Sequence, residues 1–156
     1  MRVGFGYDSH VFDEGRPLVL GGVRIPGAPG LKGHSDADAL LHAVIDALLG
    51  ATARGDIGSH FPDTDPKWKG ADSAMLLQCV MDEIRAEGWR VENLDATVIC
   101  ERVRLRPHVD AIRSRLAEFL LVPVDAVSVK GKTNEGMDAV GAGRGLCVHA
   151  VALLYR

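Results

Sequence analysis

Asp8, His10 and His42 are the residues whose chemical types and spacing most clearly favour chemistry. Asp8 and His10 are two residues apart in a segment of alternating character, so an extended strand presents both side chains on one face. His42 lies in a later segment whose apolar residues have helical spacing. If that helix packs beside the strand, the three side chains converge. Two imidazoles, one carboxylate and an open fourth position form the ligand set of a catalytic zinc ion.

This ligand set leaves two questions open. Non-haem iron in oxygenases uses the same two histidines and one carboxylate, so the spacing does not choose the metal. Asp-x-His is also a short and frequent string, and the spacing is compatible with unrelated polar residues on two exposed faces. The three residues by themselves therefore predict a candidate metal site without assigning its ion.

Asp38 and Asp46 flank His42 at intervals of four residues. On a helix this spacing forms one polar stripe opposite the leucines. Ligand histidines commonly donate their second ring N–H to a carboxylate. Either aspartate is therefore a candidate to orient a ligand imidazole.

The segment 33–35, Gly-His-Ser, lies at the expected start of the helix. Free backbone N–H groups at a helix start favour an anion, and the His34 side chain can donate to a phosphate oxygen. A simple capping loop with an exposed histidine is the alternative. The aspartates of the following loop either bind hydroxyl groups or only stabilise turns. They are Asp56, Asp63 and Asp65.

A second set of polar residues lies near the end of the chain, at Lys130, Lys132, Thr133 and Glu135. Lysine and threonine donate to phosphate oxygens, and a glutamate carboxylate can hold a magnesium ion that is shared with phosphates. The same residues are also compatible with an ordinary solvated loop.

Positioning these side chains requires several elements, which the sequence pattern predicts in alternation. Ser35 is the expected N-cap of the first helix, with Asp38 as its capping-box partner. The class is α/β or α+β, one sheet with helices packed on it. We expect strands at 2–11, 18–20, 23–25, 94–100, 127–130 and 146–154, helices at about 36–50, 72–87 and 107–120, and loops at 26–33, 52–70 and 132–145.

Composition limits the classes of protein that remain. The 156 residues fit one domain, and a net charge of -3 argues against a broad basic surface for nucleic acid while permitting a small anionic ligand. The three cysteines are odd in number and far apart, which predicts free thiols in a cytoplasmic protein. We find no apolar run of about 18 to 20 residues and no signal-peptide pattern, so no membrane partner is expected.

Taken together, the motifs of this chain resemble those of the 2-C-methyl-D-erythritol 2,4-cyclodiphosphate synthase family of the non-mevalonate isoprenoid pathway. No single string is specific, but they occur in the family's order and at its spacing. The matching strings are Gly6-Tyr7-Asp8-Ser9-His10, Gly21-Gly22-Val23-Arg24-Ile25-Pro26, Gly33-His34-Ser35-Asp36-Ala37-Asp38 with His42, Gly55-Asp56-Ile57-Gly58, Phe61-Pro62-Asp63-Thr64-Asp65-Pro66, Arg106-Pro107-His108 and residues 130–135. The resemblance weakens after that point, where the family's arginine falls on Ala142.

The resemblance implies a single catalytic domain over residues 1–156, with a mixed four-stranded, ferredoxin-like sheet that carries helices on one face. It implies a homotrimer with active sites at subunit interfaces. Asp8, His10 and His42 would bind one zinc ion per subunit, and Glu135 would help to hold magnesium or manganese with the substrate diphosphate.

The implied substrate is 4-diphosphocytidyl-2-C-methyl-D-erythritol 2-phosphate, and the products are the cyclic diphosphate and CMP. His34 and Thr133 would be the catalytic residues that steady the reacting phosphates. The implied substrate contacts are Asp8, Ser9, His10, His34, Ser35, Asp56, Ile57, Gly58, Phe61, Pro62, Asp63, Thr64 and Asp65, followed by Cys100, Glu101, Arg102, Val103, Arg104, Leu105, Arg106, Lys132, Thr133, Asn134 and Glu135.

Two other functions use the same residues. An iron oxygenase would share the three ligands, but the chain lacks the many short strands of a jelly roll. A cytidine-nucleotide-binding module with structural zinc would need four protein ligands, and only three fit.

Overall fold

The strand that carries Asp8 and His10 is the longest element of the chain, and it pairs with a different neighbouring strand along each of its halves. The computed structural model describes residues 1–156. The strands are β1 (Arg2–Leu20), β2 (Val23–Leu31), β3 (Arg90–Ile99), β4 (Val127–Lys132) and β5 (Gly145–Tyr155). The helices are α1 (Ala39–Ala51), α2 (Ile57–His60), α3 (Ser73–Ala86), α4 (Val109–Leu120) and α5 (Asp138–Gly141), with short 3-10 turns at Pro66–Trp68, Arg106–His108 and Val124–Ala126.

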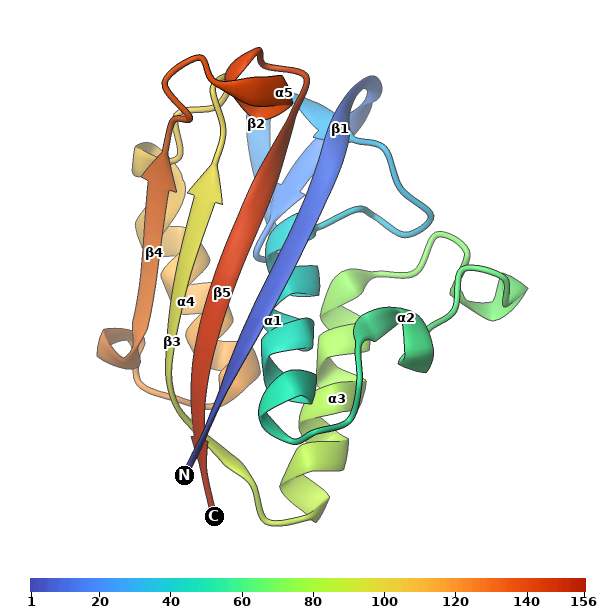
Figure 1. Cartoon of the computed structure of the whole chain (residues 1–156), viewed down its shortest axis with the longest axis vertical. Helices are drawn as coiled ribbons and strands as arrows, with labels where there is room; N and C mark the ends of the chain where they lie inside the picture. Colours follow the sequence, from blue (N-terminus) through green and yellow to red (C-terminus); the bar gives the residue numbers. More distant parts are fainter.

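The five strands form one mixed sheet in the order β2-β1-β5-β3-β4. The first half of β1 pairs antiparallel with β5, and its second half bends away to pair with β2. The bend coincides with register shifts between Asp13 and Leu18, as expected where bulges increase the local twist. Strands β3 and β4 are parallel and are connected through α4. The helices α1 and α4 lie on the same side of the sheet, with α3 beside α1 (Figure 1).

Three expectations about the sheet were wrong. It has five strands and not four, because the predicted loop at 26–33 mostly continues β2 as far as Leu31. Prolines are tolerated there because β2 is an edge strand next to a bulge. The sheet is also not ferredoxin-like. That fold runs β-α-β-β-α-β, whereas this chain, apart from β2, runs β-α-β-α-β-β.

Helix α1 is apolar on nearly all sides because it lies between the sheet and α3. Its leucines, valine and isoleucine are fully buried. Two glycines of β1 face this helix. A Cβ atom at Gly4 would lie 1.8 Å from the Ala47 carbonyl oxygen, and one at Gly6 would lie 1.8 Å from that of Ala43. The backbones of β1 and α1 therefore pack directly against each other, which places Asp8 and His10 beside His42.

The start of α1 also differs from the prediction. The helix begins at Ala39 with Asp38 as its N-cap, and Ser35 lies outside it. The Asp38 carboxylate accepts from the backbone N–H of Leu41 and from those of Gly21 and Gly22 in the β1–β2 turn. Burial raises the pKa of Asp38 to about 6, against the opposing effect of these three donors. The residue thus joins the hairpin to the helix. The predicted positions of α3 and α4 are confirmed to within about two residues.

The two ends of the chain lie side by side at one end of the sheet (Figure 1). Arg2 pairs with Leu154, and the guanidinium groups of Arg2 and Arg156 lie 5.0 and 4.5 Å from the centre of the buried Trp89 ring. Contacts of this kind between a cation and an aromatic face are favourable. None of the helices is long and apolar enough to cross a membrane.

Candidate metal centre and substrate pockets

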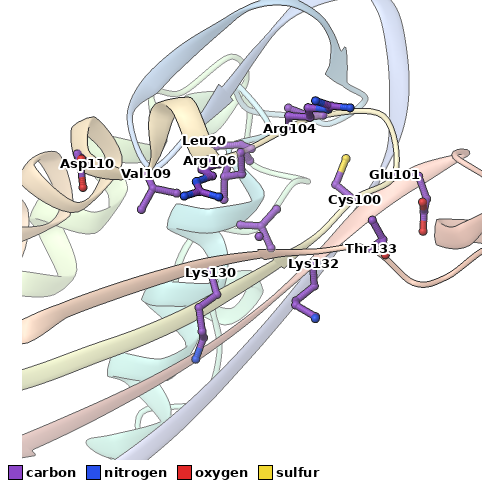
Figure 2. A pocket seen from close by; sticks show the side chains of 14 residues that line it. Leu20, Cys100, Glu101, Arg104, Arg106, Val109, Asp110, Lys130, Lys132 and Thr133 are labelled. Carbon is purple, nitrogen blue, oxygen red and sulfur yellow. The ribbon is translucent and has the colours of Figure 1, made fainter.

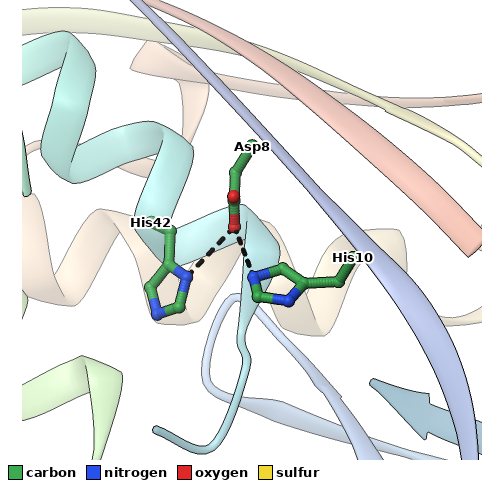
Figure 3. A group of neighbouring side chains, drawn as sticks. All are labelled: Asp8, His10 and His42. Atoms are coloured by element: carbon green, nitrogen blue, oxygen red, sulfur yellow. Dashed lines mark hydrogen bonds and ion pairs between the residues drawn. The ribbon is translucent and has the colours of Figure 1, made fainter. Parts of the chain in front are cut away.

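Asp8, His10 and His42 meet at the junction of β1 and α1. One carboxylate oxygen, Asp8 Oδ2, lies 2.9 Å from His10 Nε2 and 3.0 Å from His42 Nδ1 (Figure 3). The three donor atoms lie within 4.8 Å of one another. The predicted convergence of the three side chains is therefore confirmed.

The hydrogen bonds of His10 indicate what the cluster requires. His10 Nδ1 lies 2.7 Å from the Lys32 carbonyl oxygen, which can only accept a hydrogen bond. Nδ1 therefore carries the proton, and neutral His10 directs the lone pair of Nε2 towards a carboxylate oxygen. That arrangement is repulsive unless a second proton on the ring or a metal ion lies between the two atoms.

The donor set fits zinc. Bonds of about 2.0 to 2.1 Å around a tetrahedral ion hold the donor atoms roughly 3.3 Å apart, so the observed spacing of Asp8 from the two imidazoles needs to open only slightly. All three side chains are largely buried, and two nitrogens with one oxygen are ligands that zinc accepts.

The charges within the cluster already favour a bound cation. Burial alone would raise the pKa of Asp8, but hydrogen bonds from His10 and His42 outweigh it, and the net pKa is lowered. Burial likewise lowers the pKa of His10, while its hydrogen bond and charge interaction with Asp8 raise it overall. A carboxylate that stays ionised and an imidazole that binds a proton more tightly both show that the site attracts positive charge.

Asp38 and Asp46 do not bond the ligand imidazoles, so their predicted orienting role was wrong. Asp38 is occupied by the three backbone donors described above. Asp46 Oδ1 accepts from the Ile57 N–H at 2.8 Å and so ties α1 to α2. The contacts to the imidazoles come instead from the Lys32 carbonyl and from two serines, Ser35 and Ser73. The sequence could not indicate these partners, because a backbone carbonyl has no side-chain signal and Ser73 is 31 residues from His42.

A cavity of about 220 Å³ opens beside the metal ligands. It unites several predicted contacts from β1, α1 and the loop around α2, together with Trp68 and Leu76, which were not predicted. The lining residues are Asp8, His10, His34, Ser35, His42, Ile57, Gly58, Phe61, Asp63, Trp68 and Leu76. The Phe61 and Trp68 rings meet edge to face with their centroids 4.9 Å apart, which gives the cavity an apolar wall.

Other predicted contacts lie outside this cavity. Asp56 caps α2 by accepting from the Ser59 N–H and hydroxyl, and Asp65 caps the turn at Pro66–Trp68. Ser9 is exposed on β1 between Asp8 and His10, so it points to the opposite face of the sheet. Pro62 and Thr64 do not line the cavity either. Their contact with a substrate stays a prediction.

The loop that carries His34 is held by Arg16. The two terminal nitrogens of this guanidinium donate to the Gly33 carbonyl at 2.8 Å and to the Ser35 carbonyl at 2.5 Å. These carbonyls flank His34, whose side chain lines the cavity. A fixed loop geometry is what a phosphate-binding histidine requires.

A second and larger cavity, of about 890 Å³, lies between β3, β4 and the start of α4 (Figure 2). Arg104 and Arg106 supply positive charge, and Leu20, Val98 and Val109 supply apolar surface. The Lys130 and Lys132 side chains extend on the other side of β4 (Figure 2). The full lining is Leu20, Val98, Cys100, Glu101, Val103, Arg104, Leu105, Arg106, Val109, Asp110, Lys130, Gly131, Lys132 and Thr133. A partly apolar cavity with two cations suits a planar ring that carries phosphates.

The remaining predicted residues lie at or beyond the edge of this cavity. Arg102 forms an ion pair with Glu14 at 2.8 Å. The Asn134 N–H donates to the Glu101 carboxylate. Glu135 accepts a 2.7 Å hydrogen bond from the Thr133 hydroxyl, so the candidate magnesium ligand lies directly beside a residue of the cavity.

Within one chain the two cavities are separate. They share no lining residue. β1 and β4 are three strand positions apart in the sheet, which corresponds to about 14 Å at the usual strand spacing. His34 and Thr133, both expected at the reacting phosphates, therefore lie in different cavities of the same chain.

Comparison with known proteins gives a consistent result. The sequence profile of the YgbB family matches residues 1–155. The 2-C-methyl-D-erythritol 2,4-cyclodiphosphate synthase of Salinibacter ruber is 56% identical over 154 residues, covering 99% of this chain and 98% of that protein. The synthase of Pseudomonas syringae pv. tomato is 55% identical over 156 residues, covering 100% and 99% of the two chains.

Solved structures agree with these relatives. A structure of 2-C-methyl-D-erythritol 2,4-cyclodiphosphate synthase in its CDP-bound form matches with a TM-score of 0.91 and 40% identity, over 99% of this chain and 100% of that one. The bifunctional IspDF of Campylobacter jejuni matches with a TM-score of 0.94 and 39% identity over 98% of this chain, which spans only 42% of that longer protein. The chain therefore belongs to the YgbB family, the family of the 2-C-methyl-D-erythritol 2,4-cyclodiphosphate synthases.

Proposed function

We propose that this chain cyclises 4-diphosphocytidyl-2-C-methyl-D-erythritol 2-phosphate with the release of CMP, using both cavities. The relatives are synthases over their full length, and as a member of their family the chain is a lyase of isoprenoid biosynthesis. The observation that carries the mechanism is the convergence of Asp8, His10 and His42 beside a cavity that also contains His34. A cytoplasmic location is consistent with three free cysteines.

The reaction needs little acid–base chemistry. An oxygen of the 2-phosphate attacks the β-phosphorus, the bond from that phosphorus to the bridging oxygen breaks, and CMP leaves with the bonding electrons. The main obstacle is repulsion between anionic groups, which cations and hydrogen-bond donors reduce while they hold the groups in line. Bound by Asp8, His10 and His42, zinc would supply a Lewis acid that polarises the β-phosphate.

Chain residues would fix the positions of the two phosphates. His34 and Ser35 offer donors at the edge of the smaller cavity beside Asp8, His10 and His42, which we call the zinc-side cavity. Lys132 and Thr133 offer donors at the larger cavity, which we call the nucleotide side. Glu135 would help to hold magnesium or manganese with the diphosphate, and its position beside Thr133 suits that role. The larger cavity would hold the cytidine part, and a structural relative in a CDP-bound form supports a cytidine nucleotide as the ligand of this family.

We assign the complete site to neighbouring copies of the chain, assembled as a homotrimer. One copy would contribute its zinc-side cavity and the next its nucleotide side, because the two are separate within a chain. The uncovered face of the sheet supports such an assembly. It exposes several large apolar side chains on β1 and β5, a feature of association surfaces, namely Val3, Phe5, Tyr7, Val11, Val151 and Tyr155.

Phosphorus NMR tests the activity directly. With zinc, and with magnesium or manganese present, the purified protein is expected to convert the named substrate into a cyclic diphosphate and CMP in equal amounts. Omitting the second cation while zinc is kept should slow the reaction strongly. Hydrolysis of the substrate to a linear diphosphate would refute the cyclising function, and an unchanged spectrum would refute any activity on this substrate.

Mixing two variants tests the shared site. His42→Ala disables the zinc side, and Lys132→Glu disables the nucleotide side. In a random cyclic trimer of the two, about one site in four combines intact halves, so co-refolded mixtures should regain about a quarter of the parent activity. Light scattering should give three times the 16.7 kDa subunit mass. An inactive mixture of correctly assembled trimers would show that each chain contains its own complete site.

A further inference from the structure

The ring nitrogen of His42 that faces away from Asp8 has two serine hydroxyls near it. His42 Nε2 lies 2.9 Å from Ser73 Oγ and 3.2 Å from Ser35 Oγ. A histidine that binds metal through Nδ1 must carry its proton on Nε2, and the partner of that N–H usually fixes the ring. The two hydroxyls differ in their ability to act as this partner.

Ser73 can only accept from His42. Its hydroxyl donates to the Asp36 carboxylate in a short hydrogen bond, and its backbone N–H donates to the other Asp36 oxygen at 3.1 Å. A hydroxyl has a single proton, so Ser73 presents a lone pair to His42 Nε2. Ser73 is fully buried, so its position next to the ring is fixed by packing.

Ser35 does not have this restriction. Its oxygen accepts from the Ala37 N–H at 3.1 Å, and its own proton is not committed to another acceptor. It can therefore donate to or accept from Nε2. Ser35 fits either tautomer of His42, whereas Ser73 fits only the one with the proton on Nε2.

We propose that Asp36 and Ser73 are positioning residues that hold His42 as the Nε2–H tautomer and so direct the lone pair of Nδ1 at the metal. The carboxylate acts on the imidazole through a bridging hydroxyl. This takes the place of the direct contact from Asp38 or Asp46 that the sequence suggested. The inference deepens the proposed function, since it rests on the zinc site assigned there.

Zinc affinity separates this role from simple packing. With zinc alone in competition with a chromophoric chelator, Ser73→Ala is expected to weaken binding about 10-fold to 100-fold, the usual effect of losing a partner of a ligand histidine. Asp36→Asn should weaken it in the same direction. Ser35→Ala is the matched control, because it removes the other hydroxyl from the same nitrogen, and its affinity should stay within about threefold of the parent.

The hydrogen bond from His42 to Ser73 can be read by nitrogen NMR of histidine-labelled protein. In the zinc-loaded parent the His42 Nε2–H proton should exchange slowly with water, because the buried Ser73 oxygen accepts it. Ser73→Ala should speed this exchange, whereas Ser35→Ala should leave it unchanged. Without metal, Asp8 Oδ2 lies 3.0 Å from Nδ1 and also accepts a proton, so the readout there is again the exchange of the Nε2 proton. Equal effects of Ser73→Ala and Ser35→Ala on zinc affinity and on exchange would overturn the proposal. If the metal-free parent shows a slowly exchanging Nε2 proton but binds no zinc, the metal assignment fails while the positioning role stands.

Discussion

Replacing His42 by alanine is expected to abolish stoichiometric zinc binding and to lower the rate of cyclodiphosphate formation by at least about a thousandfold, equivalent to about 4 kcal/mol of transition-state stabilisation. Only Asp8 and His10 would remain, on one strand, and two ligands do not hold zinc against water. The lost rate is of the size expected when a metal that stabilises transferring phosphates is removed.

Metal analysis of the dialysed protein and a coupled CMP assay measure the two effects. His60→Ala is the control for metal content. The His60 imidazole lies 3.0 Å from the Arg54 carbonyl oxygen and lines neither cavity, so this variant should keep one zinc per chain. Circular dichroism checks that both variants fold. A folded His42→Ala protein with full zinc occupancy would contradict the ligand assignment.

Replacing Gly6 by alanine is expected to have a comparably large effect, although no functional side chain changes. The new methyl group would lie 1.8 Å from the Ala43 carbonyl oxygen, and that oxygen belongs to the backbone of the central helix. Neither backbone can yield locally, so β1 and α1 must separate. We expect a loss of about 3 kcal/mol or more in the free energy of unfolding, at the upper end for an overpacked core. Zinc should also be lost, because His42 is the neighbour of Ala43 and moves with it.

Gly50→Ala provides a matched control on the same interface. A Cβ atom there would lie 3.7 Å from the Phe5 carbonyl oxygen, an ordinary contact. Replacing a helical glycine by alanine stabilises a helix by up to about 1 kcal/mol, so this variant should be neutral or slightly more stable. Urea unfolding and zinc analysis compare the two proteins. A Gly6→Ala variant with parent stability and parent zinc content would show that the contact between backbones does not set the geometry.

The convergence of the candidate metal ligands could be predicted only in part from local periodicity, which also allowed unrelated polar residues on two exposed faces. The ordered motifs shared with a known family decided between these two interpretations. Asp8 and His10 share a face in any extended strand, and His42 lies on a helix whose apolar residues are unmistakable. What the pattern could not supply was the contact between β1 and α1, since a pair of glycines is equally consistent with a turn. The partners of the imidazoles were missed for a related reason. The Lys32 carbonyl has no side-chain signal, and Ser73 reads as the first residue of a helix.

The sheet was harder to predict than the ligands. Pro26, Gly27, Pro29 and Gly30 favour a loop, yet they form part of β2 because an edge strand needs only half of its backbone hydrogen bonds. Asp38 was assigned to the wrong partner because its helical spacing from His42 is real, but its carboxylate turns to the hairpin glycines, which lie far from it in sequence. Trp68 lines the zinc-side cavity. It was not predicted there because it lies in the loop at 52–70, whose residues show neither helical nor strand periodicity.

Arg2 and Arg156, which both lie against the Trp89 ring, bring the two ends of the chain together. This affects where another domain can be joined to this one. Both ends of the chain leave the sheet at the same end of two neighbouring inner strands, and Asp8 is six residues along β1 from Arg2, a distance of about 20 Å in a strand. A tether at either end therefore starts well away from the metal ligands. A second domain can be attached there without reaching the candidate metal ligands, and the match to the bifunctional IspDF of Campylobacter jejuni, of which this chain covers only 42%, shows this fold within a longer protein.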